Sequence, residues 1–244
     1  MLPMRYTPPQ VVLPEVHPVH IGHIGVGFAA KRVAPRTSLA TLVVAAYFLD
    51  LQWPLTLWLE HHGAHAGPGD PAFCPVDLGP YFHSLFMALV WGAVLALAYR
   101  ARTRYATGAV VVGLAVLSHW VLDFVAHDPD LWLAPGLAMR VGLGLGDSSR
   151  ALAISEGALV IAGLALYLRT MRAKSWVGHV SLWSMVGVLA LRFFGHSVWH
   201  RYDLPFAVET PRVFPFAVLV LMVWLILVDR SRTLRTAPEA LTTP

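Results

Sequence analysis

A histidine and an aspartate, His119 and Asp123, stand four residues apart inside the apolar stretch "LSHWVLDFVAH". At that spacing on an α-helix the two side chains lie on one face, one turn apart. An imidazole nitrogen and a carboxylate oxygen so placed can ligate one metal ion such as zinc, iron or manganese. The pair can equally be a hydrogen-bonded pair in a helical core or part of a proton relay.

Further ionisable residues stand inside apolar stretches elsewhere in the chain. Asp50 lies in "YFLDLQWP", His83 in "YFHSLF" and Glu156 near the start of another apolar run. Such groups cost about 2.5–3.5 kcal/mol at the centre of a membrane helix, so they usually face the bundle interior and mark a site. These residues are therefore candidates for the same site as His119 and Asp123.

The composition predicts a membrane protein. Hydrophobic residues make up 57% of the chain and charged residues 13%, whereas soluble domains have roughly 45–50% and about 25%. The mean hydropathy of +0.60 points the same way. The single cysteine, Cys74, excludes an intramolecular disulfide and a cysteine-cluster metal site, and the net charge of +4 does not suggest a nucleic-acid partner.

We expect an all-α, polytopic bundle of about six transmembrane helices, since each span needs roughly 20 apolar residues. Residues 1–19 are expected to be irregular, residues 20–228 to form one transmembrane helical domain, and residues 229–244 to be a polar cytoplasmic tail. The expected spans are Ser38–Leu59, Tyr81–Tyr99, Ala106–Val125, Ala151–Leu168, Trp176–Phe194 and Phe214–Val228. The apolar run "HIGHIGVGFAA" at residues 20–30 forms a helix too short to span the membrane.

The basic residues predict the orientation of the chain. Twelve of them fall in groups of three before the first span, between the second and third, between the fourth and fifth, and after the sixth. The positive-inside rule places these groups, and therefore the C-terminus, in the cytoplasm. This topology brings Asp50, His83, His119 and Asp123 to the outer half of the bundle. His23 reaches that level only if the helix at residues 20–30 enters the membrane; otherwise it lies flat on the cytoplasmic surface.

The order of these motifs resembles the membrane-bound metal-dependent hydrolase family of bacteria and archaea. The resemblance covers about residues 20–135 and rests on Gly22-His23, "FLDLQWP", "FHSLF" and "LSHWVLDF". It implies a prokaryotic inner-membrane protein. The metal ligands it implies are His23, Asp50, His83, His119 and Asp123. The family's aspartate motif commonly continues with a second Asp and a His, where this chain has Gln52 and Trp53.

The resulting functional hypothesis is hydrolysis by a water that a divalent metal, zinc in the first place, activates. Asp123 or Glu156 would orient or deprotonate that water. A site inside the bilayer suggests a membrane lipid or a lipid-like ester or phosphoester as substrate; the oligomeric state stays open. The alternatives are a small-solute or ion transporter that uses the Asp and His cluster as an ion or proton site, and a polar cluster kept for folding. His61, His62 and His65, and His196 and His200, are weaker ligand candidates.

Overall fold

The computed structural model of the chain describes residues 21–52, 55, 78–201 and 214–235. Helices dominate this part of the chain, and only two pairs of short strands occur in it. Four helical segments are long and apolar enough to cross a membrane: Gly79–Thr103, Ala106–Ala126, Arg150–Thr170 and Trp176–Phe193. A helical membrane protein is thus supported, whereas the count of six spans stays a prediction.

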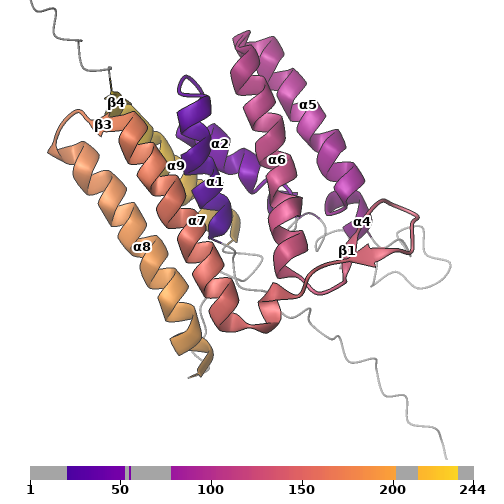
Figure 1. Ribbon diagram of the computed structural model, residues 1–244. Coiled ribbons are helices and arrows are strands. Elements are labelled where there is room, and N and C mark those ends of the chain that lie inside the picture. Colours follow the sequence, from indigo (N-terminus) through magenta and orange to yellow (C-terminus); the bar gives the residue numbers. More distant parts are fainter. Residues whose placement is uncertain (1–20, 53–54, 56–77, 202–213, 236–244) are drawn as a thin grey trace, which may run out of the picture.

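The second and third predicted spans form a helical hairpin, α5 and α6 (Figure 1). A single turn, α4 (Gly79–Phe82), leads into α5 (Leu85–Thr103), and α6 follows as Ala106–Ala126. The Ser84 hydroxyl accepts a hydrogen bond from the Met87 backbone N–H and so caps the start of α5. Arg104 takes a left-handed conformation, with φ of 56°, and ends that helix.

The C-terminal half supplies three further helices, α7 (Ser149–Thr170), α8 (Trp176–Arg201) and α9 (Phe214–Arg230). Strand β3 (Met171–Ala173) joins α7 to α8 and pairs antiparallel with β4 (Arg232–Leu234). The start of the predicted polar tail is therefore tied back to the bundle. Between α6 and α7 lie β1 (Leu131–Trp132), β2 (Arg140–Val141) and the 3₁₀ turn η2 (Leu145–Asp147).

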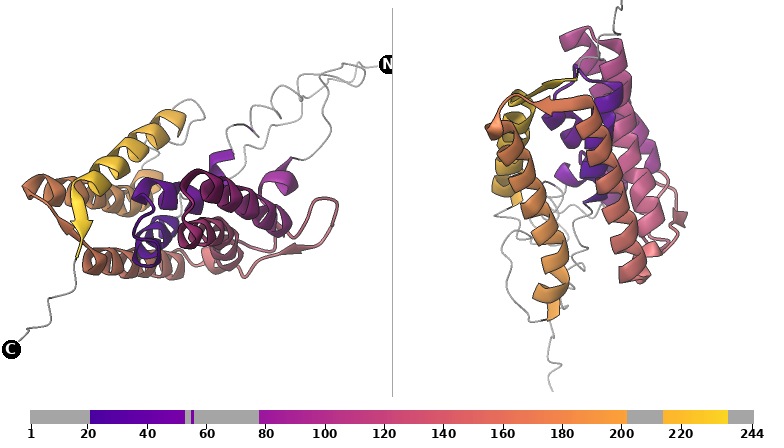
Figure 2. Two further views of the ribbon diagram at one scale, coloured as in Figure 1. Left: turned by 90° about the horizontal axis from the view of Figure 1, so that it is seen from above. Right: turned by 60° about the vertical axis from the view of Figure 1, so that its left-hand side comes forward.

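The short helix at the N-terminal end, α1 (Gly22–Val33), lies inside the bundle. With α2 (Leu39–Ala46) it sits between the α5–α6 hairpin and the α7–α9 group (Figure 2). Ile24 and Phe28 of α1 and Leu42 of α2 are fully or almost fully buried. At about 1.5 Å per residue, the 12 residues of α1 extend only about 18 Å. Because α1 is inserted among the other helices, it carries His23 into the interior.

The predicted span over Ser38–Leu59 is not one continuous helix. The α-helix ends at Ala46, and a 3₁₀ turn, η1 (Asp50–Gln52), follows. The break leaves the Ala46 carbonyl without its helical partner, and it accepts a hydrogen bond from the His119 ring instead. Beyond the interruption, Asp50 lies beside α6, with its Oδ1 3.3 Å from Nε2 of His119.

Glycines let α1 approach its neighbours backbone to backbone. A Cβ on Gly163 of α7 would lie 2.0 Å from the Gly25 carbonyl oxygen, and a Cβ on Gly25 would lie 2.5 Å from the Leu159 carbonyl oxygen. A Cβ on Gly27 would likewise lie 3.0 Å from the Cα of Val43 of α2. Small residues at helix contacts allow such close packing in membrane proteins. They set the depth and rotation of α1, and therefore the position of His23.

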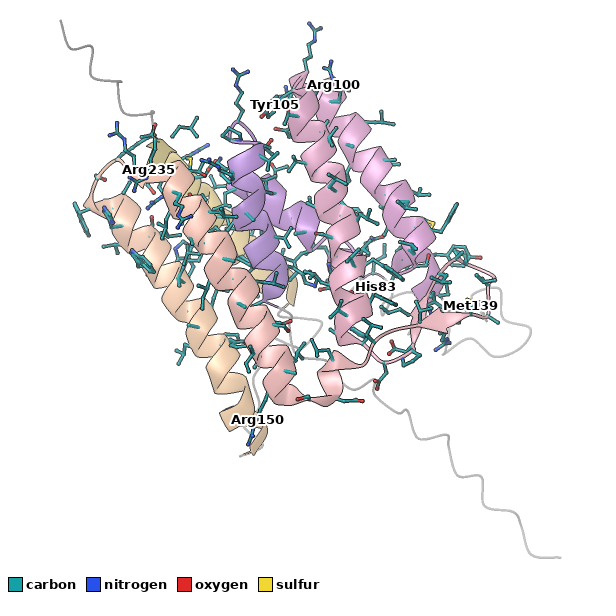
Figure 3. The ribbon with its side chains drawn as sticks, viewed as in Figure 1. His83, Arg100, Tyr105, Met139, Arg150 and Arg235 are labelled. Atoms are coloured by element: carbon teal, nitrogen blue, oxygen red, sulfur yellow. The ribbon has the colours of Figure 1, made fainter. Side chains whose placement is uncertain are left out.

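Charged residues separate toward the two ends of the bundle. Arg100 and Arg235 lie at one end and Arg150 at the other, with His83 between them (Figure 3). At the first end, the buried Lys31 ammonium lies 2.6 Å from the Asp229 carboxylate and donates to the Thr37 carbonyl. The ion pair fastens the end of α1 to α9. Large apolar side chains on the outer faces, such as Leu97 and Ile161, are exposed, as lipid-facing residues would be.

Candidate metal centre

Five side chains from four parts of the chain meet beside α6. They are His23 in the first turn of α1, Asp50 in η1, His83 just before the Ser84 cap of α5, and His119 and Asp123 on α6. His23 and His119 are completely buried, and Asp123 is 3% exposed. The side chains of His83 and Asp50 are 27% and 38% exposed and form the more open side. These are the five residues that the motifs indicated; their role as ligands stays a prediction.

Asp123 is at the centre of the group. Its Oδ2 lies 2.7 Å from Nε2 of His83 and 3.1 Å from Nε2 of His119. Its Oδ1 lies 3.4 Å from Nε2 of His23. One buried carboxylate therefore faces three imidazoles.

The backbone determines the tautomer of His119. Its Nδ1 lies 2.7 Å from the Ala46 carbonyl oxygen, which can only accept, so Nδ1 carries a hydrogen. In the neutral ring, Nε2 then presents a lone pair. This arrangement is typical of metal-binding histidines, whose other ring nitrogen donates to a carbonyl or a carboxylate.

The lone pair of His119 is directed toward negative charge. Nε2 lies 3.1 Å from Asp123 and 3.3 Å from Asp50, yet neither contact is aligned as a hydrogen bond. A lone pair between two carboxylates is unfavourable unless a cation lies among them. That cation can be a proton on the ring or a metal ion, and the site is in either case built for positive charge.

The separations of the donor atoms distinguish ligands from hydrogen-bonding partners. Zinc bonds of about 2.0–2.2 Å in tetrahedral geometry place neighbouring ligand atoms about 3.3–3.6 Å apart. The His23–Asp123, His119–Asp50 and His119–Asp123 contacts, at 3.4, 3.3 and 3.1 Å, are close to that range. The His83–Asp123 contact of 2.7 Å is instead a hydrogen bond. A buried His and Asp group that could hold a metal ion is therefore present.

Aromatic contacts hold the imidazoles in place. The rings of His23 and His119 stack with their centroids 4.1 Å apart and their planes at 7°. His83 meets His119 edge-on at 5.1 Å, and Tyr47 meets His23 in the same way at 5.1 Å. The sequence contains no signal for Tyr47 or for the Ala46 carbonyl, because both depend on where α2 breaks.

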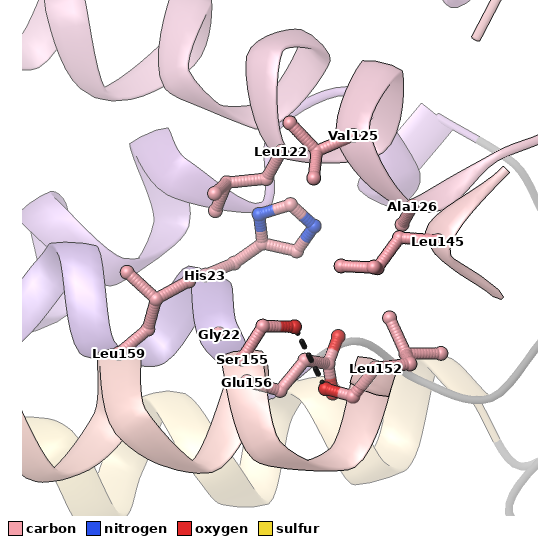
Figure 4. Close-up of a pocket in the computed structure, with 10 residues that line it drawn as sticks. All are labelled: Gly22, His23, Leu122, Val125, Ala126, Leu145, Leu152, Ser155, Glu156 and Leu159. Carbon is pink, nitrogen blue, oxygen red and sulfur yellow. Dashed lines mark hydrogen bonds between the residues drawn. The ribbon is translucent and has the colours of Figure 1, made fainter. Parts of the chain in front are cut away.

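Glu156 lies on α7, on the other side of His23, and lines a small cavity with it (Figure 4). Its Oε2 accepts a hydrogen bond of 3.3 Å from the Ile21 backbone N–H at the start of α1. A carboxylate at a helix N-terminus is stabilising. This contact gives Glu156 a part in holding α1, and its predicted action on water stays a prediction.

The weaker candidates are not placed by the structure. His61, His62 and His65 lie outside the described residues, and so do the side chains of His196 and His200.

Comparison of the sequence with protein-family models, with curated proteins and with solved structures finds no match.

Proposed function

We propose that the protein is a membrane-embedded, metal-dependent hydrolase that acts on an amphiphilic ester or phosphoester. The observation that supports this proposal most directly is the His119 ring, whose lone-pair nitrogen faces two carboxylates while its other nitrogen donates to a backbone carbonyl. His23 and Asp123 complete a buried donor set of nitrogen and oxygen atoms. Zinc fits such a set, and manganese or iron are the alternatives.

His23, His119 and Asp123, whose donor atoms lie close together, would hold the ion. Asp50 contacts His119 from the more open side of the cluster. A divalent metal bound there supplies a Lewis acid that lowers the pKa of a water molecule and stabilises negative charge on the scissile group. The stacking of His23 on His119 and the Ala46 carbonyl keep the two rings oriented without the substrate. Preorganisation of this kind is what a catalytic site requires of its supporting groups.

His83 is assigned a different role, the movement of a proton. Its Nε2 is within hydrogen-bond distance of Asp123, and its side chain is partly exposed, unlike the other two imidazoles. A histidine in this position can accept a proton from the attacking water as a general base and pass it on to the departing oxygen. Asp123 would orient His83 for this transfer, as carboxylates orient catalytic imidazoles elsewhere.

The surroundings of the site indicate the class of substrate. The site lies between helices long and apolar enough to cross a membrane, so a substrate that reaches it from the bilayer needs an apolar part. We place the protein in a prokaryotic inner membrane, as the family resemblance implies. We place its C-terminus in the cytoplasm, because the basic segments of the sequence favour this orientation. Membrane lipid is then both the solvent of the bundle and the source of the substrate.

The test is turnover in proteoliposomes by protein loaded with zinc, manganese or iron. Vesicles would carry single-chain acyl esters and alkyl phosphates, and the released acid, alcohol or phosphate would be measured. The wild type should hydrolyse one of the two classes, and Asp123→Asn should abolish the reaction while the helix content is retained. Turnover of neither class with any metal would overturn the hydrolase proposal. Proton or ion flux that depends on Asp123 would then favour transport.

A further inference from the structure

A small cavity opens where α1 begins. Helix α1 packs against both α6 and α7 but begins only at Gly22. At the level of His23, a cavity of about 60 Å³ lies between α6 and α7. Its walls are Leu122, Val125 and Ala126 of α6, Leu152, Ser155, Glu156 and Leu159 of α7, Leu145 of η2, and Gly22 and His23 of α1 (Figure 4).

The walls of this cavity are mostly apolar, and its polar side chains are those of His23, Ser155 and Glu156. Six of the lining residues are Leu, Val or Ala. The Ser155 hydroxyl donates to the Leu152 carbonyl at 2.9 Å, and Oε2 of Glu156 accepts from Ile21. These polar groups are thus engaged with the backbone. Buried water needs two to four polar partners, so the cavity suits a hydrocarbon group better than water.

The cavity adjoins the donor cluster, with the His23 ring between them. The His23 ring forms part of its wall, and the same ring's Nε2 is 3.4 Å from Asp123. Next to the lining residues, Val121 of α6 and Ile154 of α7 are 47% and 72% exposed. In a membrane these outward faces meet lipid chains. A chain could therefore run from the lipid phase, between α6 and α7, to the site.

We propose that this cavity receives the methylene groups next to the scissile bond of a single-chain lipid. The inference rests on the proposed hydrolase function and names its substrate class, a single-chain acyl ester or alkyl phosphate. One buried water molecule needs about 10–15 Å³. A cavity of about 60 Å³ therefore holds only a few heavy atoms and excludes a second chain. In the reaction, water oxygen bonds to the acyl carbon or phosphorus, the ester bond breaks, and the water's proton passes to the departing oxygen.

The test is photocrosslinking in phosphatidylcholine vesicles and does not require turnover. The first probe is a long-chain alkyl phosphate with a diazirine on a methylene next to the phosphate. The second probe is the same alkyl phosphate with the diazirine at the methyl end of the chain. The first probe should label lining residues such as Leu122, Leu152 and Leu159. The second should label exposed positions such as Ile161. If the first probe labels the lining residues no more strongly than the second probe does, the proposal is overturned.

Two variants of equal added volume sharpen this test. Ala126→Leu places a larger side chain in the cavity wall, whereas Ala158→Leu places it on α7 outside the cavity lining. The first should lose the crosslinks to the lining residues and the second should keep them. Equal labelling in both variants would contradict the proposal. If the lining residues are labelled only after residues 1–20 are removed, the occupant of the cavity is the chain's own N-terminal segment. That result would overturn the proposal.

The two proposals fail separately. Bound metal is measured in the same samples, so metal binding without the crosslinks would sink the chain-binding cavity alone. Crosslinks in a protein that binds no metal would leave the lipid site standing and remove the hydrolase. Turnover with metal but without the crosslinks would leave the hydrolase standing without this cavity.

Discussion

Adding one methyl group to Gly163 should displace His23 from the donor cluster. In Gly163→Ala the new Cβ would lie 2.0 Å from the Gly25 carbonyl oxygen and 2.9 Å from its Cα. Carbon and oxygen atoms in contact stay about 3.3 Å apart or more. Helix α1 must therefore move away from α7 by roughly 1.3 Å, the difference between that contact distance and the 2.0 Å separation from the Gly25 oxygen. His23 is on the same helix, two residues from Gly25, and must move with it.

The consequence for metal binding follows from the tolerance of metal sites. Ligand distances in such sites stay within about 0.2 Å of their ideal values. A movement several times larger removes His23 from the ligand set. We expect the metal affinity to fall by at least about 10–100-fold, the cost of losing one supporting contact around a metal. Overpacking should also lower the free energy of unfolding by about 1–3 kcal/mol.

Gly157→Ala is the matched control on the same helix. A Cβ at Gly157 meets nothing within 4 Å, and alanine favours a helix over glycine by up to about 1 kcal/mol. This variant should bind metal as the wild type does and be slightly more stable. The assay is competitive zinc titration of detergent-purified protein, with helix content followed by circular dichroism. If Gly163→Ala binds zinc as tightly as Gly157→Ala while both are folded, the packing of α1 on α7 does not control the position of His23.

Three further outcomes are expected. His83→Gln should keep the bound metal but slow hydrolysis about 10²-fold or more, because His83 contacts Asp123 by a hydrogen bond and supplies a proton path; loss of metal would instead make His83 a ligand. Lys31→Met should lower the free energy of unfolding by about 3 kcal/mol, because it leaves the Asp229 carboxylate without its ion pair. The double variant Lys31→Met with Asp229→Leu should recover most of that loss, as measured by chemical denaturation. Tyr167→Phe should raise the free energy of unfolding by no more than about 1 kcal/mol, since the buried Tyr167 hydroxyl has no hydrogen-bond partner among the described residues. A large decrease in the free energy of unfolding would show that the hydroxyl has a partner.

The long helices could be predicted from hydropathy alone. The predicted span Ala106–Val125 corresponds to α6 at Ala106–Ala126, and Ala151–Leu168 lies within α7. Continuous apolar runs of this length have few alternatives in a membrane. The interruption of α2 at Ala46 could not be predicted, because residues 43–49 on either side of it are as apolar as those of a continuous span. The break is accompanied by a tertiary contact, the hydrogen bond from His119.

The proximity of these residues could be predicted, but their contacts could not. Ionisable side chains in apolar stretches indicated a shared interior position for Asp50, His83, His119 and Asp123, and the family resemblance added His23. The structure brings the five together, and their role as ligands stays a prediction. Which carboxylate meets which imidazole depends on the rotation and depth of each helix. The contacts of Gly25 with Leu159 and of Gly163 with Gly25 determine both for α1, and such contacts cannot be assigned to partners from a single sequence.

Bound metal in the purified protein tests the central claim most directly. The comparison is wild type against His119→Ala and Asp123→Asn, with His179→Ala, an exposed histidine on α8, as control. The donor set predicts about one zinc, manganese or iron ion per chain in the wild type and in His179→Ala. The same ion should be lost in both site variants while their helix content is retained. A wild-type protein that holds no metal after supplementation, or site variants that keep it, would contradict the metal centre.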